Sequence, residues 1–237
     1  MVELNFDTTV ADVISTYRAV VENVEIDAAS DAERAYGGVV RAKKGGMVEK
    51  MAAQMVSIAW NNLGKSRDDL KLSQEKVAIH LQEDYLNNLP PDVAADIRSN
   101  LQEYVYNCKV DLHLLVKDKF VLGIECKAFA ENAMYKRILA DFHLLKMQHP
   151  NLHCVLLQLE SQLGGDYSDI SKATITGSKS SRTLESYFPE AAPHVITLLK
   201  GERNVKKPIH KPEHYKELKP ESVERAIKVL EGIFSRI

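Results

Sequence analysis

Three residues near the middle of the chain have the types and the spacing that phosphodiester hydrolysis requires. Asp111 lies in one run of alternating apolar residues, and Glu125 and Lys127 lie at the end of a second run. Neighbouring carboxylates bind a divalent cation through hard oxygen ligands, and the cation activates a water molecule. A lysine beside them can orient that water and stabilise the charge that develops on the phosphate.

A β-hairpin would bring these residues together. Apolar residues alternate over positions 110–116 and again over 120–126, a period typical of strands. If residues 117–119 form a three-residue turn, Asp111 lies opposite Glu125, with Cβ atoms about 4.5–5.5 Å apart. Lys127 projects from the same face, since side chains alternate along a strand. The opposite face is then expected to be apolar, formed by Val110, Leu112, Leu114, Val116, Phe120, Leu122, Ile124 and Cys126.

The clustered charges predict a metal site. We expect Asp111 and Glu125 to hold Mg²⁺, with the backbone carbonyl of Cys126 as a third ligand, and Lys127 to act on the attacking water. Grouping these charges on one face costs free energy through desolvation and repulsion unless a metal or a phosphate compensates. The alternative is a cluster of surface ion pairs. His113 shares this face, and we expect it to be a hydrogen-bonded structural residue.

The same residues resemble the motif of a known family. Val110-Asp111, followed by Gly123-Ile124-Glu125-Cys126-Lys127-Ala128, resembles the PD-(D/E)xK nuclease motif, with Val110 in place of the proline. The helical and apolar patterns over 131–159 extend the resemblance to that family's common core. The resemblance implies an α/β fold with a restriction-endonuclease-like core, in which a mixed central β-sheet is flanked by helices. It also implies metal-dependent cleavage and, very often, type II restriction of double-stranded DNA.

Glu49 is a candidate for a fourth carboxylate in the site. The resemblance implies it, because related nucleases often bring a glutamate to the metal from an N-terminal helix; a solvated helix residue is the alternative. A second E-x-K pattern, Glu217-Leu218-Lys219, follows no apolar strand and has no aspartate on a partner strand. We therefore do not assign this second pattern to the catalytic site.

Basic and amide residues outside the hairpin are candidates for DNA contact. Asn132, Lys136 and Arg137 begin the helix after the catalytic strand, where the resemblance implies groups that approach DNA. Asn and Arg can also read adenine and guanine, and ordinary solvated helix charges are the alternative. The basic stretches 41–44 and 200–219 are expected to contact phosphates. Within these stretches the candidates are Lys43, Lys44, Arg203, Lys206 and Lys207.

The length and composition of the chain indicate the number of domains and the class of protein. The chain has 237 residues, a formal net charge of -2 and 45% hydrophobic residues, which suits one folded domain. We expect a single endonuclease domain over 1–237, with a catalytic core at about 46–200 and a basic, helical C-terminal part at about 200–237. The pI of about 6.5 excludes a uniformly cationic nucleic-acid binder.

The spacing of the cysteines and the hydropathy of the chain predict where in the cell the protein is located. Cys108, Cys126 and Cys154 form no C-x-x-C pair, as expected of a reduced intracellular protein. No apolar stretch approaches the ~18 residues of a membrane span, and the N-terminus has no export signal. We expect a cytoplasmic protein without membrane contact.

The remaining patterns predict the elements around the hairpin. Helices are expected from the Gly45-Gly46 pair to about 61–64, and over 92–104, 131–148 and 220–237. A further helix is expected over 9–24. Extended segments are expected at 70–81, 154–159 and 194–199, and the Gly-, Ser- and Thr-rich stretch 164–186 is expected to be a loop.

The combined prediction is a Mg²⁺-dependent endonuclease that cleaves double-stranded DNA, and most specifically a sequence-specific type II restriction enzyme. Such enzymes usually act as twofold homodimers, because two identical sites can then address the two strands. The alternatives are a DNA repair or recombination nuclease of the same fold and a non-catalytic DNA-binding module. The complete set of Asp111, Glu125 and Lys127 argues against loss of activity.

Overall fold

A mixed five-stranded sheet forms the centre of the protein. The computed structural model describes residues 2–30, 36–73, 75–168 and 179–237. The strands are β1 (Leu70–Ser73), β4 (Leu112–Val116), β5 (Lys119–Glu131), β6 (His153–Gln162) and β7 (His194–Thr197), in that spatial order. The β1–β4 and β4–β5 pairs are antiparallel, and the β5–β6 and β6–β7 pairs are parallel. The predicted mixed sheet is confirmed.

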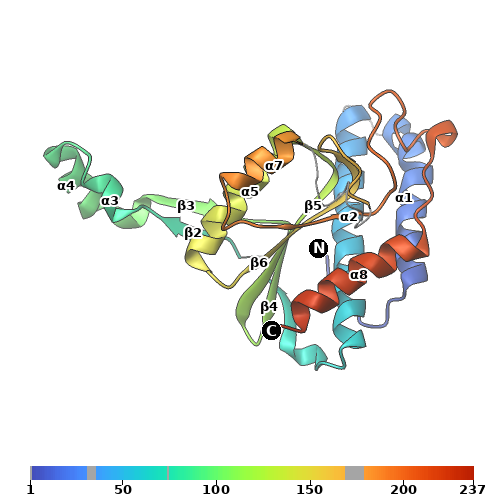
Figure 1. Ribbon diagram of the computed structural model, residues 1–237, viewed down its shortest axis with the longest axis horizontal. Helices are drawn as coiled ribbons and strands as arrows, with labels where there is room; N and C mark the ends of the chain where they lie inside the picture. The colour runs from blue at the N-terminus through green and yellow to red at the C-terminus, as the bar shows by residue number, and fades with distance from the viewer. Residues whose placement is uncertain (1, 31–35, 74, 169–178) are drawn as a thin grey trace.

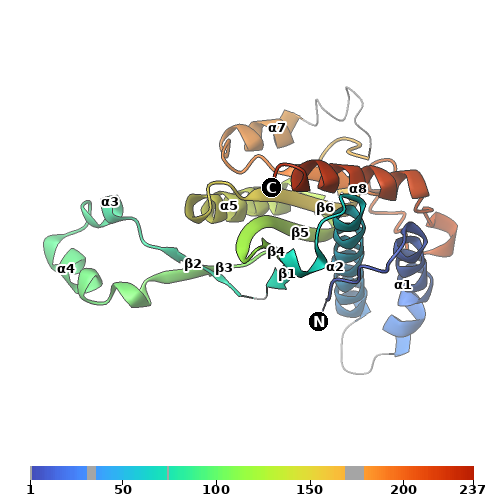
Figure 2. The same cartoon turned by 90° about the horizontal axis from the view of Figure 1, so that it is seen from below.

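Helices cover both faces of this sheet, as Figure 1 and Figure 2 show. On one face lie α1 (Val10–Ser30), α2 (Tyr36–Asn62) and α8 (Pro220–Phe234), and on the other lie α5 (Asn132–Gln148) and α7 (Lys179–Ser186). Each face buries its own apolar core. Within the described part of the chain, no helix is both long and apolar enough to cross a bilayer. Short 3₁₀-helices occur at Arg67–Asp69, Leu101–Glu103 and Pro212–His214.

The turn of the β4–β5 hairpin is shorter than predicted. Val116 pairs with Lys119, which leaves only Lys117 and Asp118 in the turn. These two residues have φ angles of 49° and 61°, and positive φ at both positions is typical of a type I′ turn. The predicted three-residue turn is therefore wrong.

A β-bulge compensates for the shorter turn. Leu115 pairs with Phe120 and Leu114 pairs with Leu122, so Val121 is an extra residue in β5. Val121 and Leu122 both pack on the α2 side, whereas Phe120 packs beneath α5. Beyond the bulge, Leu112 pairs with Ile124, which is the register that the sequence predicts for Asp111 and Glu125.

The predicted single apolar face of the hairpin is wrong at two positions. Val110 and Phe120 pack in the core beneath α5, whereas Leu112 packs on the α2 side. Val110 precedes β4, where the alternation of a strand does not apply. Phe120 lies between the turn and the bulge, which reverses its face.

Two predictions outside the hairpin are also wrong. α2 begins at Tyr36, so Gly45 and Gly46 lie inside the helix, where packing against α1 offsets the low helix propensity of glycine. The predicted loop over 164–186 contains α7 in its last part, and its residues 169–178 lie outside the described residues. The other predicted helices and strands agree with the structure to within a few residues at most boundaries.

A hairpin extension projects from the sheet, as Figure 1 and Figure 2 show. It consists of β2 (Val77–His80), α3 (Glu83–Leu86), α4 (Pro91–Ser99) and β3 (Val105–Cys108). β2 pairs antiparallel with β3, and we call residues 77–108 the arm. The helix predicted over 92–104 ends at Ser99, because Asn100 has a φ of -130°, outside the helical range.

Phe234 fixes α8 to the core, and its truncation tests that role. The ring is fully buried and lies edge-on to Trp60, with centroids 5.2 Å apart. Phe234→Ala leaves a cavity and is expected to lower the free energy of unfolding by about 3–5 kcal/mol. Ile237→Ala, at a position that is 42% exposed, is expected to change it by less than about 0.5 kcal/mol. Urea unfolding followed by circular dichroism measures both, and equal decreases would contradict the role of Phe234.

Candidate active site

Asp111, Glu125 and Lys127 meet where β4 begins beside the middle of β5. Asp111 directly precedes β4, and its Oδ2 accepts a 2.7 Å hydrogen bond from the backbone N–H of Cys126. The ammonium of Lys127 donates to Asp111 Oδ2 at 3.4 Å and to Glu125 Oε1 at 2.5 Å. The structure thus brings the three predicted residues into direct contact.

Three oxygen atoms converge on the ammonium of Lys127. They are Asp111 Oδ2 and Glu125 Oε1, as above, and the carbonyl oxygen of Cys126 at 3.1 Å. These atoms belong to the groups that the sequence assigns to Mg²⁺, and carboxylate and carbonyl oxygens are the ligands that this ion takes. Among the described residues, no three His, Cys, Asp or Glu side chains are grouped so as to hold a metal ion. A metal site here therefore needs the backbone carbonyl, and the residues present fit it.

Burial and mutual charge interactions shift the pKa values of Glu125 and Lys127. The side chains of Glu125 and Lys127 are only 14% and 22% exposed. Burial raises the pKa of Glu125 and Asp111 raises it further, although Lys127 opposes both effects. Burial lowers the pKa of Lys127, but the attraction of Glu125 and Asp111 outweighs this and the pKa is raised. The ammonium is held charged, and the carboxylates favour a bound cation.

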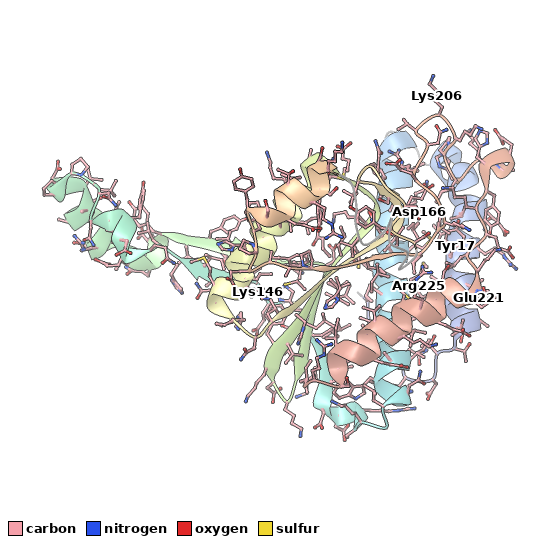
Figure 3. All side chains as sticks on the ribbon, in the orientation of Figure 1. Tyr17, Lys146, Asp166, Lys206, Glu221 and Arg225 are labelled. Atoms are coloured by element: carbon pink, nitrogen blue, oxygen red, sulfur yellow. The ribbon has the colours of Figure 1, made fainter. Side chains whose placement is uncertain are left out.

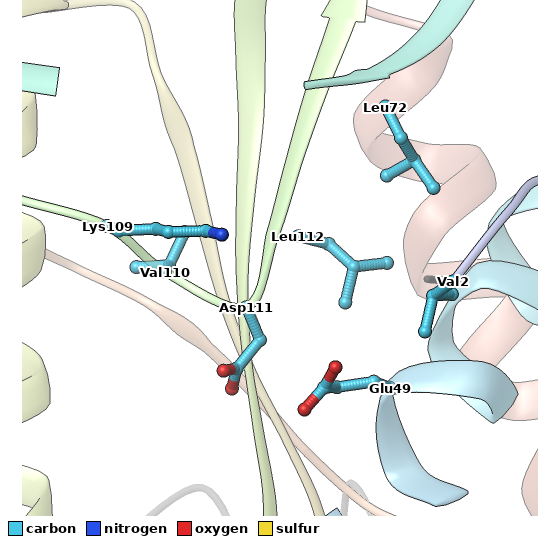
Figure 4. Close-up of a pocket in the computed structure, with 7 residues that line it drawn as sticks. All are labelled: Val2, Glu49, Leu72, Lys109, Val110, Asp111 and Leu112. Atoms are coloured by element: carbon cyan, nitrogen blue, oxygen red, sulfur yellow. The ribbon is translucent and has the colours of Figure 1, made fainter. Parts of the chain in front are cut away.

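Glu49 brings a further carboxylate near Asp111. Figure 4 shows the side chain of Glu49 extending from α2 toward Asp111, which lies in the segment before β4. Burial raises the pKa of Glu49 and Asp111 raises it further, whereas Lys127 and Lys109 lower it. Both carboxylates line a hollow with a volume of about 320 Å³. The other residues that line it are Val2, Leu72, Lys109, Val110 and Leu112.

Comparison with known proteins identifies the class of enzyme. No family model matches the chain. The type II restriction enzyme DdeI of Desulfomicrobium norvegicum is 44% identical to it over 236 residues, which cover 98% of each chain. The chain belongs to the type II restriction endonucleases. This restriction enzyme is therefore a site-specific deoxyribonuclease, as the sequence predicted, rather than a repair nuclease or a non-catalytic module.

A solved structure shows only a weak likeness to this chain. The native BbvCI A2B2 tetramer aligns with this restriction enzyme at a TM-score of 0.37 and 11% sequence identity. The alignment covers 95% of this chain and 88% of that chain.

Two charged residues of the restriction enzyme's site were not predicted. Lys109 lines the hollow and lowers the pKa of Glu49. Asp141, on α5, lies close enough to Glu125 to contribute to its raised pKa. The position of Lys109, two residues before Asp111, was a possible signal in the sequence. Asp141 comes from a different element, and no local pattern connects it with the hairpin.

His113 positions the segment that carries Asp111. Its ring is 3% exposed, and its Nε2 accepts a 3.0 Å hydrogen bond from the backbone N–H of Val110. It also stacks on Phe120, with centroids 4.6 Å apart and an interplanar angle of 16°. Burial, followed by the charge of Lys109, lowers its pKa to about 4. The predicted structural role of His113 is confirmed.

The residues predicted to contact DNA differ in the exposure of their side chains. Those that are exposed are Lys43, Lys136, Arg137, Lys206 and Lys207. Figure 3 shows Lys206 at the edge of the molecule, extending away from it. Lys44, Asn132 and Arg203 are partly buried. Asn132 Oδ1 accepts a 2.9 Å hydrogen bond from the hydroxyl of Ser181, which ties it to α7.

Lys44 lies near two charged residues, the buried Glu160 and Arg203. Glu160 is 4% exposed and lies 2.7 Å from the ammonium of Lys216. Burial lowers the pKa of Lys44 to about 8, an effect that Glu160 opposes and Arg203 increases. Lys44 Nζ also lies 2.8 Å from His210 Nδ1. These contacts fasten the basic C-terminal stretch to α2 and β6.

The pH dependence of the unfolding free energy tests the role of His113. Because its pKa is about 4 when folded and 6.5 ordinarily, the unfolded chain takes up the proton first as the pH falls. Its contribution to stability is therefore complete above about pH 6.5 and disappears toward pH 4, by at most about 3 kcal/mol. His113→Gln should remove this pH dependence, and His80→Gln, at an exposed position, should retain it. Equal pH slopes of the unfolding free energy in the parent and in His113→Gln would contradict this assignment.

Proposed function

We propose that this restriction enzyme hydrolyses phosphodiester bonds of double-stranded DNA with Mg²⁺ bound by Asp111, Glu125 and the carbonyl of Cys126. The observation that carries the proposal is the convergence of these oxygen atoms on one positively charged nitrogen. Glu49 lies beside them and adds negative charge. The 44% identity to DdeI supports sequence-specific cleavage.

Each residue of the cluster has a proposed part in the reaction. When bound, Mg²⁺ would polarise the scissile phosphate and lower the pKa of a ligated water. Asp111 and Glu125 would hold the ion, while the N–H of Cys126 keeps the Asp111 carboxylate in place. Lys127 directs its ammonium to the attacking water and to the charge that develops on the phosphate. Glu49 increases the negative potential that attracts the cation.

We propose that the exposed basic residues contact the DNA backbone. Phosphate contacts position a protein on DNA, and base contacts specify the sequence. Lys44 and Arg203, being partly buried, would support such contacts by holding the basic stretch in place. Asn132 and Arg137 are proposed to approach base edges from the start of α5. The residues proposed for phosphate contact are Lys43, Lys136, Lys206 and Lys207.

We also propose that residues 1–237 act as one domain, as a homodimer in the cytoplasm. Apolar residues of α1 and α8 lie in the same core as those of the sheet, which supports a single domain. Two identical cleavage sites related by a twofold axis suit the two strands of DNA. Cys108, Cys126 and Cys154 are all free and buried, which suits a reducing compartment.

The catalytic proposal predicts that Lys127 contributes more to the rate of cleavage than to the affinity for DNA. Lys127→Ala is expected to bind cognate DNA nearly as well as the parent in Ca²⁺, yet to cut it in Mg²⁺ at least about 10²-fold more slowly. Cutting by the parent should stop in a chelator. Lys219→Ala is the matched control, because Lys219 is exposed at the start of α8 and belongs to the other E-x-K pattern. Single-turnover cleavage gives the rates, and a slower Lys219→Ala than Lys127→Ala would place the active site elsewhere.

The proposed phosphate contacts predict a change in salt dependence. Replacing Lys206 and Lys207 by Ala should weaken binding to cognate and non-cognate DNA alike and reduce the slope of log K against log salt by roughly 0.9 for each phosphate that is no longer neutralised. Lys228→Ala, at an exposed position on α8, should leave the slope unchanged. Fluorescence anisotropy in Ca²⁺ over a range of salt measures both. An unchanged slope in the double variant would remove the basic stretch from the DNA surface.

A further inference from the structure

The arm carries a large share of the exposed apolar surface. Among the described residues, nine large hydrophobic side chains are exposed, and five of them lie in the arm, which has 32 of the 237 residues. The five are Tyr85, Val93, Leu101, Tyr104 and Tyr106, which are 39–57% exposed. Tyrosine and apolar residues gathered on a surface are typical of a protein interface.

The arm buries little apolar surface of its own. Its outer part buries Leu86, Ala94 and Ile97, which belong to neither core of the sheet, whereas Ile79 and Cys108 at its base belong to the core beneath α5. A two-stranded ribbon is marginally stable without further packing. The outer arm therefore gains stability from any partner that covers its exposed residues.

The charge of the arm indicates which partner fits. The arm has five carboxylates and one basic residue, Arg98, a formal charge of -4. The remaining residues carry 30 basic and 28 acidic side chains, a charge of +2. An acidic surface is repelled by DNA phosphates, so the arm is unsuited to the DNA backbone. It is complementary in charge to the rest of this same chain.

We propose that the arm of one copy packs against the body of a second copy, and that the second arm does the same in return. The inference rests on the proposed homodimer and assigns its contact surface. A twofold axis makes the arm–body contact twice, and places each acidic arm on a body of opposite charge. β3 continues through Lys109 and Val110 into Asp111, so the contact also fixes the spacing of the two cleavage sites.

Sedimentation of the full chain in a chelator tests the proposal. We expect the parent to be a dimer and the double variant Tyr104→Glu, Tyr106→Glu to dimerise at least about 100-fold more weakly, as for the removal of central interface residues. The matched control is the double variant Tyr187→Glu, Val205→Glu. Tyr187 and Val205 are 77% and 62% exposed and lie outside the arm, so this control should remain dimeric.

A second pair of substitutions guards against misfolding of the arm. Asp92 and Asp96 are exposed on α4, and Asp92→Lys, Asp96→Lys reverses their charge without touching a buried residue. This variant should also weaken dimerisation, and the parent's dimer should weaken with added salt. Circular dichroism and thermal unfolding check that each variant is folded.

The outcomes distinguish the two proposals. A monomeric parent would overturn both the homodimer and the arm contact, while the test at Lys127 would still decide catalysis. A dimeric parent whose two arm variants stay dimeric would overturn the arm contact alone. Reduced DNA affinity in folded arm variants, with dimerisation unchanged, would assign the arm to DNA instead.

Discussion

The hydrogen bond from the N–H of Cys126 to Asp111 Oδ2 is the contact on which the geometry of the candidate site depends. Asp111 lies outside the ladder of β4, so backbone pairing does not fix it. The 2.7 Å bond ties its carboxylate to the middle of β5, and a bond to an ionised acceptor is stronger than one between neutral groups. From the other side, His113 holds the backbone of Val110. Two bonds thus place one carboxylate between two packed cores.

The hairpin could be predicted because its information is local. The alternation of apolar residues identified both strands, and the catalytic residues follow from their positions within that alternation. The turn length was wrong, yet the register near Asp111 was right, because the bulge at Val121 added the residue that the two-residue turn omitted. Neither the turn type nor the bulge has a clear signal here, since Lys117-Asp118 lacks the glycine typical of such turns.

Contacts between distant elements could not be predicted from local patterns. Glu49 was suggested only by the resemblance to nucleases, and it comes to the hairpin because α2 packs across the sheet. Asp141 reaches the site from α5 in the same way. The DNA contacts were predicted from the positions of lysines and arginines in the sequence, which do not show whether these side chains are buried. Lys44 and Arg203 are predicted DNA contacts, but both are partly buried. Lys44 lies near Glu160, a carboxylate inside β6 that no local pattern distinguishes from a solvated residue.

The base of the arm has a consequence for the evolution of this fold. Val77 and Cys108 are cross-strand partners, so the chain enters and leaves the arm at points about 5 Å apart. A segment with adjacent ends can be lengthened, shortened or exchanged while the strands beyond it keep their places. Such an insertion would be inherited and altered independently of the catalytic hairpin. An enzyme of this kind can thereby change the surface of the arm while the strands that carry Glu125 and Lys127 keep their places.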